Sequence, residues 1–427
     1  MSLTVGPVGA LNGQMRPPSD KSMTHRAYML GAIAKGPSLV ASPLRAEDCE
    51  STLECLRQLG LRAEWQNESH VRLTPADPWS QPSEALDCGN SGTTMRLLSG
   101  LLASRPLHCR LVGDESLSRR PMDRIIKPLQ LMGAEVRGTT PPLEIIGHDL
   151  HGIDYVSPVA SAQVKSCVLL AGLRASGRTS VVELAATRDH TERMLMAAGV
   201  PVLKSGPDGL TSTVSGGFRP DGFEFAVPGD ISSAAFFMVA AAILPGSELT
   251  LESVGVNPLR AGILEVFADA GVLFKLQDCA PELGEPVSHI QVRSSRDLRP
   301  IRIEGNIVPR LVDEIPVLAV LATQCHGWSQ FLDVGELRVK ESDRIAAVCQ
   351  GLSRMGAKVE LLENGFAVQG PVKLKGATIQ ANGDHRIAMA FAIAGLIADG
   401  ATEIEGAECI RTSFPEFESE LGRLCIV

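Results

Sequence analysis

The sequence predicts a two-domain α/β (α+β) protein built from six copies of one helix-and-strand unit, three in each domain, with the helices inside. Three observations support this. The chain has 427 residues, more than one hydrophobic core usually supports. A polar residue that begins an apolar helix occurs six times, and so does a glycine that ends an amphipathic helix. The two features alternate along the chain at matching intervals.

The first repeated feature is a polar residue followed directly by an apolar stretch. Ser, Asp and Asn side chains accept hydrogen bonds from the free N–H groups of a first helical turn, so they favour helix starts. Successive starts lie 69 to 71 residues apart, except for an interval of 83 between the fourth and the fifth. Stretches such as AAFFMVAAAIL are apolar nearly all round, which predicts burial. The six starts are Asp20, Asn90, Ser161, Asp230, Asp313 and Asp384.

The second repeated feature is a glycine between an amphipathic helix and a strand. Glycine there supplies the left-handed conformation that other residues resist. The spacing of these glycines also lengthens between the fourth and fifth copies, which places one insertion near 278–299. One unit cannot easily bury an all-apolar helix alone, so several units must pack together. The six glycines are Gly60, Gly133, Gly199, Gly271, Gly356 and Gly422.

Composition excludes several classes of partner and site. The net charge of −9 and the aromatic content of 4% argue against binding of nucleic acid or an anionic membrane surface. The N-terminus lacks the layout of a signal peptide, and the longest apolar stretches are too short to span a bilayer. The ten cysteines lack zinc-ligand spacings, which predicts reduced, mostly buried thiols. We therefore expect a cytoplasmic protein with no metal and no cofactor.

Several of the predicted helix starts carry basic and polar residues. A helix N-terminus bears partial positive charge and exposes N–H groups, so it attracts anions. A single such start is usually only a cap beside a solvated charge, but four starts in phase with a repeat indicate a small polyanionic substrate. The residues are Lys21, Ser22 and Arg26 on the first helix, Asn90, Gly92, Thr93 and Arg96 on the second, Ser161, Gln163 and Lys165 on the third, and His385 and Arg386 on the sixth.

Three loop segments add to this prediction. Residues 118–124 contain three arginines, the side chain best suited to bidentate contacts with carboxylate or phosphate. Residues 187–190 (TRDH) precede an amphipathic helix, and residues 339–344 (VKESDR) open the second helix of the fifth copy. The pair Glu341 and Arg344 alone would also suit an ordinary solvated helix start. Dinucleotide, P-loop, serine-hydrolase and zinc-protease signatures are absent.

The motifs together resemble those of the 5-enolpyruvylshikimate-3-phosphate synthase family, in that family's order and across residues 17 to about 417. They are PPSDKSMTHR, CGNSGTTMR, RRPMDR, SAQVKS, TRDHTERML, PGDISSAAFF, VDEIP, LRVKESDR and GDHRIAM. The resemblance implies a two-domain, inverse α/β barrel-like enolpyruvyl transferase fold with six βαβαββ repeats. It further implies domains of 17–226 and of 1–16 with 227–427, which close on substrate.

The resemblance also implies an activity, the transfer of the enolpyruvyl group of phosphoenolpyruvate to the 5-hydroxyl of shikimate 3-phosphate by addition and elimination. Phosphate is released, and the step belongs to the shikimate pathway of aromatic amino-acid biosynthesis. The implied catalytic candidates are Lys21, Asp313 and Glu341, which the sequence does not rank securely. The residues implied for shikimate 3-phosphate are Lys21, Ser22, Arg26, Ser161, Gln163, Arg188, Asp313 and Lys340. Those implied for phosphoenolpyruvate are Lys21, Asn90, Gly92, Thr93, Arg120, Gln163, Arg344 and Arg386.

Two positions depart from the family's pattern. Many members have a lysine where this chain has Thr412, beside Arg411, and position 162 is Ala rather than Ser. Gly92 keeps the small residue of the phosphoenolpyruvate pocket, so we expect glyphosate to inhibit. We also expect a monomer. The alternatives are a UDP-N-acetylglucosamine enolpyruvyl transferase, which usually has a cysteine in a loop where 112–120 has none, and a non-catalytic sugar-phosphate binding protein.

Overall fold

The computed structural model describes residues 2–426, which form two compact units. The N-terminal unit comprises Ser19–Pro228 together with the short segment Pro281–Glu285. The C-terminal unit comprises the chain up to Pro18, Gly229–Ala280, and the chain from Pro286 on. Each unit has its own hydrophobic core. The segment Pro281–Glu285 lies within the insertion that the repeat spacing predicts.

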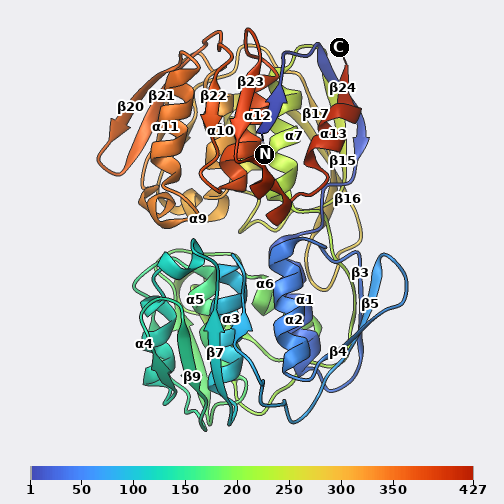
Figure 1. Cartoon of the computed structure of the whole chain (residues 1–427), viewed down its shortest axis with the longest axis vertical. Coiled ribbons are helices and arrows are strands. Elements are labelled where there is room, and N and C mark those ends of the chain that lie inside the picture. Colours follow the sequence, from blue (N-terminus) through green and yellow to red (C-terminus); the bar gives the residue numbers. More distant parts are fainter. Residues whose placement is uncertain (1, 427) are drawn as a thin grey trace. The chain divides into compact units, whose positions relative to one another are not determined.

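The N-terminal unit is built around three buried helices (Figure 1). Helix α3 packs against both α1 and α5, and every residue of α1 from Met23 to Ile33 is buried. Three more amphipathic helices bury one face each and follow α1, α3 and α5 in sequence. The bounds are α1 Lys21–Ile33, α2 Glu47–Gln58, α3 Gly92–Ala103, α4 Asp123–Leu131, α5 Ala162–Gly172 and α6 His190–Ala197.

Three four-stranded sheets complete this unit, one for each repeat. In each sheet the first two strands are parallel and the next two pairings are antiparallel. The orders are β14-β3-β5-β4, β6-β7-β9-β8 and β10-β11-β13-β12. The strands are β3 Ser38–Ala41, β4 Arg62–Trp65, β5 His70–Thr74, β6 Leu86–Asp87, β7 His108–Val112, β8 Glu135–Arg137, β9 Leu143–Ile146, β10 Asp154–Val156, β11 Arg178–Val182, β12 Leu203–Ser205, β13 Thr211–Ser215 and β14 Glu224–Ala226.

The C-terminal unit repeats this plan with buried helices α7, α10 and α12, which pack against one another (Figure 1). All residues of α10 and α12 are buried, as the apolar sequence predicts. Its helices are α7 Ile231–Ile243, α8 Gly262–Ala270, α9 Val308–Leu311, α10 Ile315–Ala322, α11 Arg344–Arg354, α12 His385–Gly395 and α13 Phe417–Leu424.

One sheet of this unit has the same pairing scheme, a second adds the antiparallel strand β24 to it, and the third has one parallel and one antiparallel pairing. Their orders are β18-β19-β21-β20, β16-β17-β15-β2-β24 and β1-β23-β22. The first strands of the chain, β1 and β2, thus belong to sheets of the C-terminal unit. The strands are β1 Ser2–Val5, β2 Ala10–Met15, β15 Glu248–Gly255, β16 Leu273–Asp278, β17 Val287–Arg293, β18 Arg302–Ile303, β19 Gly327–Phe331, β20 Lys358–Leu362, β21 Gly365–Gly370, β22 Thr378–Gln380, β23 Thr402–Glu405 and β24 Cys425–Ile426.

Four of the six predicted helix starts are confirmed as side-chain caps. Asp20, Ser161, Asp230 and Asp384 each accept a hydrogen bond from a backbone N–H of the first turn. The prediction is wrong by one residue at Asn90, because the neighbouring Ser91 makes the cap.

The prediction also fails at Asp313. That residue lies in the turn between α9 and α10, and α10 begins at Ile315 with no side-chain cap. The Asp313 carboxylate instead faces cations of the same unit.

Five of the six predicted helix-ending glycines have the expected positive φ, between 81° and 106°. The sixth prediction is wrong, because Gly422 lies inside α13 and the chain leaves that helix at Cys425 in an extended conformation. The confirmed glycines are Gly60, Gly133, Gly199, Gly271 and Gly356.

Three further properties concern the described residues 2–426. No helix among them has both the length and the apolar character needed to cross a bilayer. All ten cysteines are free thiols, and seven of them are buried. No group of three or more His, Cys, Asp and Glu side chains in this part of the chain is arranged to hold a metal ion.

Candidate active site

The N-terminal halves of α1, α3 and α5 are joined by hydrogen bonds between their side chains. Gln163 of α5 donates from Nε2 to Thr93 Oγ1 of α3 (2.9 Å) and accepts at Oε1 from Arg96 Nη1 (2.6 Å). Arg26 of α1 donates from Nη2 to Ser166 Oγ of α5 (3.0 Å). Three helix N-termini with their partial positive charges therefore meet at one place in this unit.

Arg26 is buried at this place and held in a fixed orientation. Its Nε donates to Thr191 Oγ1 of α6 (2.7 Å), and its Nη1 donates to the carbonyl of Ser22 (2.9 Å). Burial and then the nearby charge of Arg188 lower the pKa of Arg26 to about 10. The guanidinium remains charged at neutral pH, and Arg188 contributes a second positive charge beside it.

Lys21, the first residue of α1, forms an ion pair that the sequence did not reveal. Its Nζ lies 2.9 Å from Asp48 Oδ2, on the first turn of α2. Both side chains are largely buried, with exposed fractions of 16% and 9%. An acid in a first turn is typical of any helix, so only the tertiary structure identifies Asp48 as the partner of Lys21.

Arg120 is positioned from the loop that precedes α4. Its Nη2 donates to Asn90 Oδ1 (2.8 Å), and Asn90 Nδ2 donates to Asp114 Oδ2 (2.6 Å). Gly92 lies directly beside this guanidinium, because a Cβ there would stand 3.3 Å from Arg120 Nη1 and 2.9 Å from Arg96 Nη1. We call the residues gathered here the N-terminal cluster: Lys21, Arg26, Asn90, Gly92, Thr93, Arg96, Arg120, Gln163 and Arg188.

The C-terminal unit holds a second group of charges around Arg344. The guanidinium is 1% exposed and contacts Glu341 Oε2 (2.6 Å), Asp313 Oδ1 (3.3 Å) and Asp384 Oδ2 (2.8 Å). Burial would lower the pKa of Arg344, but the charges of these three carboxylates raise it above its usual value. Arg344 is thus permanently charged, and it fixes both Glu341 and Asp313.

Three further cations lie near the Asp313 carboxylate. Its Oδ1 lies 3.8 Å from Lys340 Nζ and 3.9 Å from Arg386 Nε, and its carbonyl accepts from Arg386 Nη1 (3.3 Å). Arg260 Nη1 is 3.9 Å from Asp313 Oδ2. We call this group the C-terminal cluster: Arg260, Asp313, Lys340, Glu341, Arg344, Asp384 and Arg386.

Asp230, the residue that caps helix α7, adds a buried carboxylate next to this cluster. Asp230 Oδ1 accepts from Arg260 Nη2 at 2.9 Å. Burial alone would raise the pKa of Asp230, but the charges of Arg260 and Arg386 reverse this effect and lower it. By contrast, burial raises the pKa of Glu314, whose carboxyl group contacts Ser232. No motif in the sequence pointed to Arg260 as part of the site.

The predicted site residues therefore fall into two groups, one on each unit. Ser161 lies at the start of α5, where its hydroxyl caps the helix by accepting from Val164 N (3.5 Å). Ser22 meets the N-terminal cluster through its carbonyl.

Lys165 is not part of an anion site, contrary to its interpretation as one of the basic helix starts. Its Nζ lies 2.8 Å from Glu183 and 2.9 Å from Glu192, and it donates to the Thr187 carbonyl (3.2 Å). All three charged side chains are at most 4% exposed. The two carboxylates neutralise Lys165, which instead holds the TRDH segment in place.

Acid should weaken this buried network. Burial would raise the pKa of Glu192, but Lys165 and Lys204 lower it from 4.5 to about 2. A carboxyl group with a lowered pKa stabilises the fold above its unfolded pKa and ceases to do so as pH falls through the folded value. We expect the melting temperature to decrease as the pH is lowered from 4.5 to about 2, and to decrease less steeply in Glu192→Gln. Equal slopes in melting curves of the two proteins would contradict this.

Thr412, which stands where many family members have lysine, bonds to the start of α12. Its Oγ1 lies 3.2 Å from His385 Nδ1 and also donates to the Cys409 carbonyl (2.8 Å). Arg411, next to it, is exposed. Thr412 therefore supports the helix that carries Arg386 and brings no charge of its own.

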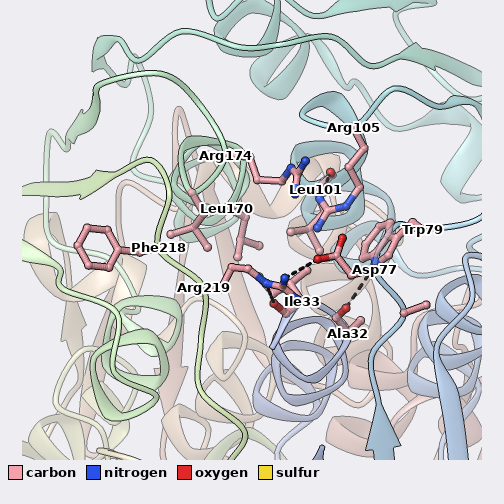
Figure 2. Close-up of a pocket in the computed structure, with 12 residues that line it drawn as sticks. Ala32, Ile33, Asp77, Trp79, Leu101, Arg105, Leu170, Arg174, Phe218 and Arg219 are labelled. Carbon is pink, nitrogen blue, oxygen red and sulfur yellow. Dashed lines mark hydrogen bonds and ion pairs between the residues drawn. The ribbon is translucent and has the colours of Figure 1, made fainter. Parts of the chain in front are cut away.

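A pocket near the C-terminal ends of α1, α3 and α5 contains arginines that bind helix carbonyls (Figure 2). Arg219 donates to the carbonyls of Ile33 and Ala34, and Arg105 to that of Leu101. Arg105 also stacks on Trp79, 3.8 Å from the ring centroid. Free carbonyls at a helix C-terminus attract such donors and disfavour anions. None of the predicted site residues lines this pocket, so it is not the candidate active site.

Comparison with solved structures identifies the class of fold. The chain is similar to two structures of the EPSP synthase from Acinetobacter baumannii, with TM-scores of 0.88 and 0.87 and identities of 42% and 40%. Each alignment covers 100% of this chain and at least 98% of the other. The predicted enolpyruvyl transferase fold is thereby confirmed.

Comparison with known sequences identifies the family. The model of the EPSP synthase (3-phosphoshikimate 1-carboxyvinyltransferase) family matches residues 5–421. A 3-phosphoshikimate 1-carboxyvinyltransferase from Pelotomaculum thermopropionicum is 49% identical over 100% of this chain and 99% of its own length. One from Bacillus cereus is 46% identical over 99% of each. The chain belongs to the EPSP synthase family, as the motifs predicted.

Proposed function

We propose that this chain transfers the enolpyruvyl group of phosphoenolpyruvate to the 5-hydroxyl of shikimate 3-phosphate. Family membership supports the overall activity, and the observation that carries the chemistry is the Arg344-centred group of carboxylates. Arg344 holds Glu341 and Asp313 in defined positions. A non-catalytic binding protein has no need of carboxylates in an anion site, because they repel the ligand.

Each substrate carries both a phosphate and a carboxylate, which suits a cation-rich N-terminal cluster. We propose that Arg26 and Arg188, with Lys21, Ser22, Ser161, Gln163, Asp313 and Lys340, bind shikimate 3-phosphate. We propose that Arg120 and Gly92, with Lys21, Asn90, Thr93, Gln163, Arg344 and Arg386, bind phosphoenolpyruvate. We propose that both clusters take part in the same reaction and that the two units are separate domains. Arg344 is largely saturated by carboxylates, so its main task is to orient them.

The reaction proceeds by addition and then elimination. The acceptor hydroxyl loses its proton as its oxygen attacks C2 of phosphoenolpyruvate, while C3 takes up a proton. The bond between C2 and the phosphate oxygen then breaks, C3 loses a proton, and the double bond forms again. Glu341 is our first choice for the proton at C3, and Asp313 for the hydroxyl, with Lys21 as the third candidate. The surrounding cations stabilise the charge that develops on the phosphate.

An acceptor comparison tests this proposal directly. Phosphate release from phosphoenolpyruvate is measured with shikimate 3-phosphate, with UDP-N-acetylglucosamine and without acceptor. We expect turnover with the first acceptor alone. Turnover only with the nucleotide sugar would show that the chain is a UDP-N-acetylglucosamine enolpyruvyl transferase instead. Binding of shikimate 3-phosphate without turnover would indicate a non-catalytic protein.

Replacement of Gly92 by alanine should weaken the phosphoenolpyruvate site. The new Cβ would displace the guanidinium groups of Arg96 and Arg120, so we expect KM for phosphoenolpyruvate to rise by about 10-fold, equivalent to about 1.4 kcal/mol. Gly36→Ala is the control, because a Cβ there meets no atom within 4 Å. Unchanged KM in Gly92→Ala would contradict the assignment of this pocket.

We further propose that glyphosate inhibits the protein at this pocket. Glyphosate has one more atom than phosphoenolpyruvate between its carboxyl carbon and its phosphorus, so it needs the space beside Gly92 even more. Inhibition should be competitive with phosphoenolpyruvate and should weaken by a larger factor than KM rises in Gly92→Ala. No inhibition of the unmodified protein at millimolar glyphosate would contradict this.

We also propose that the protein is a monomer and is located in the cytoplasm, and light scattering tests the monomeric state.

A further inference from the structure

The insertion between the fourth and fifth repeats forms a hairpin whose turn belongs to the other unit. Strands β16 and β17 pair in the C-terminal unit, whereas the connecting Pro281–Glu285 packs within the N-terminal unit. Glu282 and Glu285 exchange two backbone hydrogen bonds (2.9 and 2.8 Å) around Leu283 and Gly284. Both central residues have positive φ, 44° and 78°, as in the tight turns that favour glycine.

This turn is packed tightly against α6. Glu285 Oε1 lies 2.8 Å from His190 Nδ1, and both residues are 0% exposed. The Gly284 carbonyl accepts from Arg193 Nη1 (3.3 Å), and a Cβ on Gly284 would stand 3.2 Å from the Arg193 carbonyl. Leu283 packs on the core of the N-terminal unit. Burial of a carboxylate is costly unless it is paired, so the His190 contact fixes where Glu285 lies.

His190 connects this turn to the N-terminal cluster. It is the first residue of α6, and its neighbour Thr191 accepts from Arg26 Nε (2.7 Å) and bonds to Ser166 Oγ (2.7 Å). Arg188 lies two residues before His190 in the same segment. The carboxylate of Glu285 also favours the charged form of Arg26, against the larger effect of burial.

We propose that Glu285 is a positioning residue for the shikimate 3-phosphate site, and this inference rests on the proposed function. By holding His190, Glu285 fixes the first turn of α6, which orients Arg26 and anchors the segment that carries Arg188. Lys165 also supports this segment, through the Thr187 carbonyl. Arg120 is held by Asn90, and Gly92 lies on α3 beside that guanidinium, so we expect the phosphoenolpyruvate site to depend little on this turn.

The test compares Glu285→Gln and Glu285→Ala with the unmodified protein. Glutamine keeps an oxygen that can accept from His190 but removes the charge, whereas alanine removes the contact. We expect KM for shikimate 3-phosphate to rise about 10-fold in Glu285→Ala, as for loss of a hydrogen bond to a charged group, and less in Glu285→Gln. KM for phosphoenolpyruvate and kcat should change by less than about 3-fold, a split that mere destabilisation does not produce.

Glu282→Gln is the matched control, since Glu282 belongs to the same turn but its carboxylate accepts only a backbone bond from Ala226 (3.3 Å). Its constants should equal those of the unmodified protein. Calorimetric titration with shikimate 3-phosphate separates the possible failures. If the unmodified protein does not bind this compound, the proposed function fails. If it binds and both Glu285 variants bind equally well, or if both KM values and kcat change together, the positioning role is wrong.

Discussion

Glu341→Gln should lower kcat by at least about 100-fold, the lower range of what a positioned acid or base contributes, while changing the substrate KM values by only a few-fold. The amide keeps the size of the carboxyl group and can still accept from Arg344 Nη2, which now contacts Glu341 Oε2 at 2.6 Å. It cannot take up or deliver a proton. Arg344 retains Asp313 and Asp384, so the fold should survive the change.

The control for this variant is Glu304→Gln, on the same unit. Glu304 also pairs with an arginine, Arg302 at 2.7 Å, but it is well exposed and belongs to none of the motifs. Steady-state kinetics with both substrates varied gives kcat and the two KM values for each protein. A Glu341→Gln variant with more than a tenth of the original kcat would show that this carboxylate does not move the proton at C3.

Lys165→Met should destabilise the protein by about 3–5 kcal/mol, the usual loss when one member of a buried ion pair is removed. Glu192 would then keep its ion pair with Lys204, at 3.0 Å, whereas Glu183 would lose its ion pair with Lys165. The thermal midpoint should fall by on the order of 10 °C. Because Lys165 also holds the Thr187 carbonyl, KM for shikimate 3-phosphate should rise as well.

Lys204→Met provides the comparison, because the Lys204 side chain is 32% exposed and makes only one of the ion pairs to Glu192. This substitution should lower the free energy of unfolding by about 1 kcal/mol or less, the usual contribution of a partly exposed ion pair. The double variant Lys165→Met/Glu183→Gln should recover part of the loss, since it buries one fewer unpaired charge. Equal melting temperatures for Lys165→Met and Lys204→Met would contradict the view that Lys165 is the centre of this network.

Much of the fold could be predicted because each repeat carries its own local signals. Caps such as Asp20 and glycines such as Gly60 act through neighbouring backbone groups, so their effect is visible in a short window of sequence. Asp313 resembled a cap but is used by cations that lie far away in the sequence. The repeat spacing revealed the insertion at 278–299, but not that its turn packs on α6, because the surface on which a loop packs is decided by tertiary contacts.

The site was predicted less completely than the fold for a related reason. The sequence shows where cations occur, but not which of them have carboxylate partners. Lys165 and Arg344 both occur in basic motifs, and both are enclosed by acids from other elements. Asp48 and Arg260 were missed because their partners, Lys21 and Asp230, lie about 30 residues away, so no local spacing marks the pairs.

The central claim, enolpyruvyl transfer by addition and elimination, is tested most directly by NMR of the reaction in D2O. The protein is incubated with phosphoenolpyruvate and shikimate 3-phosphate until turnover stops. We expect one phosphate for each enol ether formed at the 5-oxygen, with deuterium in the product methylene group, because C3 gains a solvent-derived proton before it loses one. Phosphate released without an enol ether, or an enol ether with no deuterium, would contradict this mechanism.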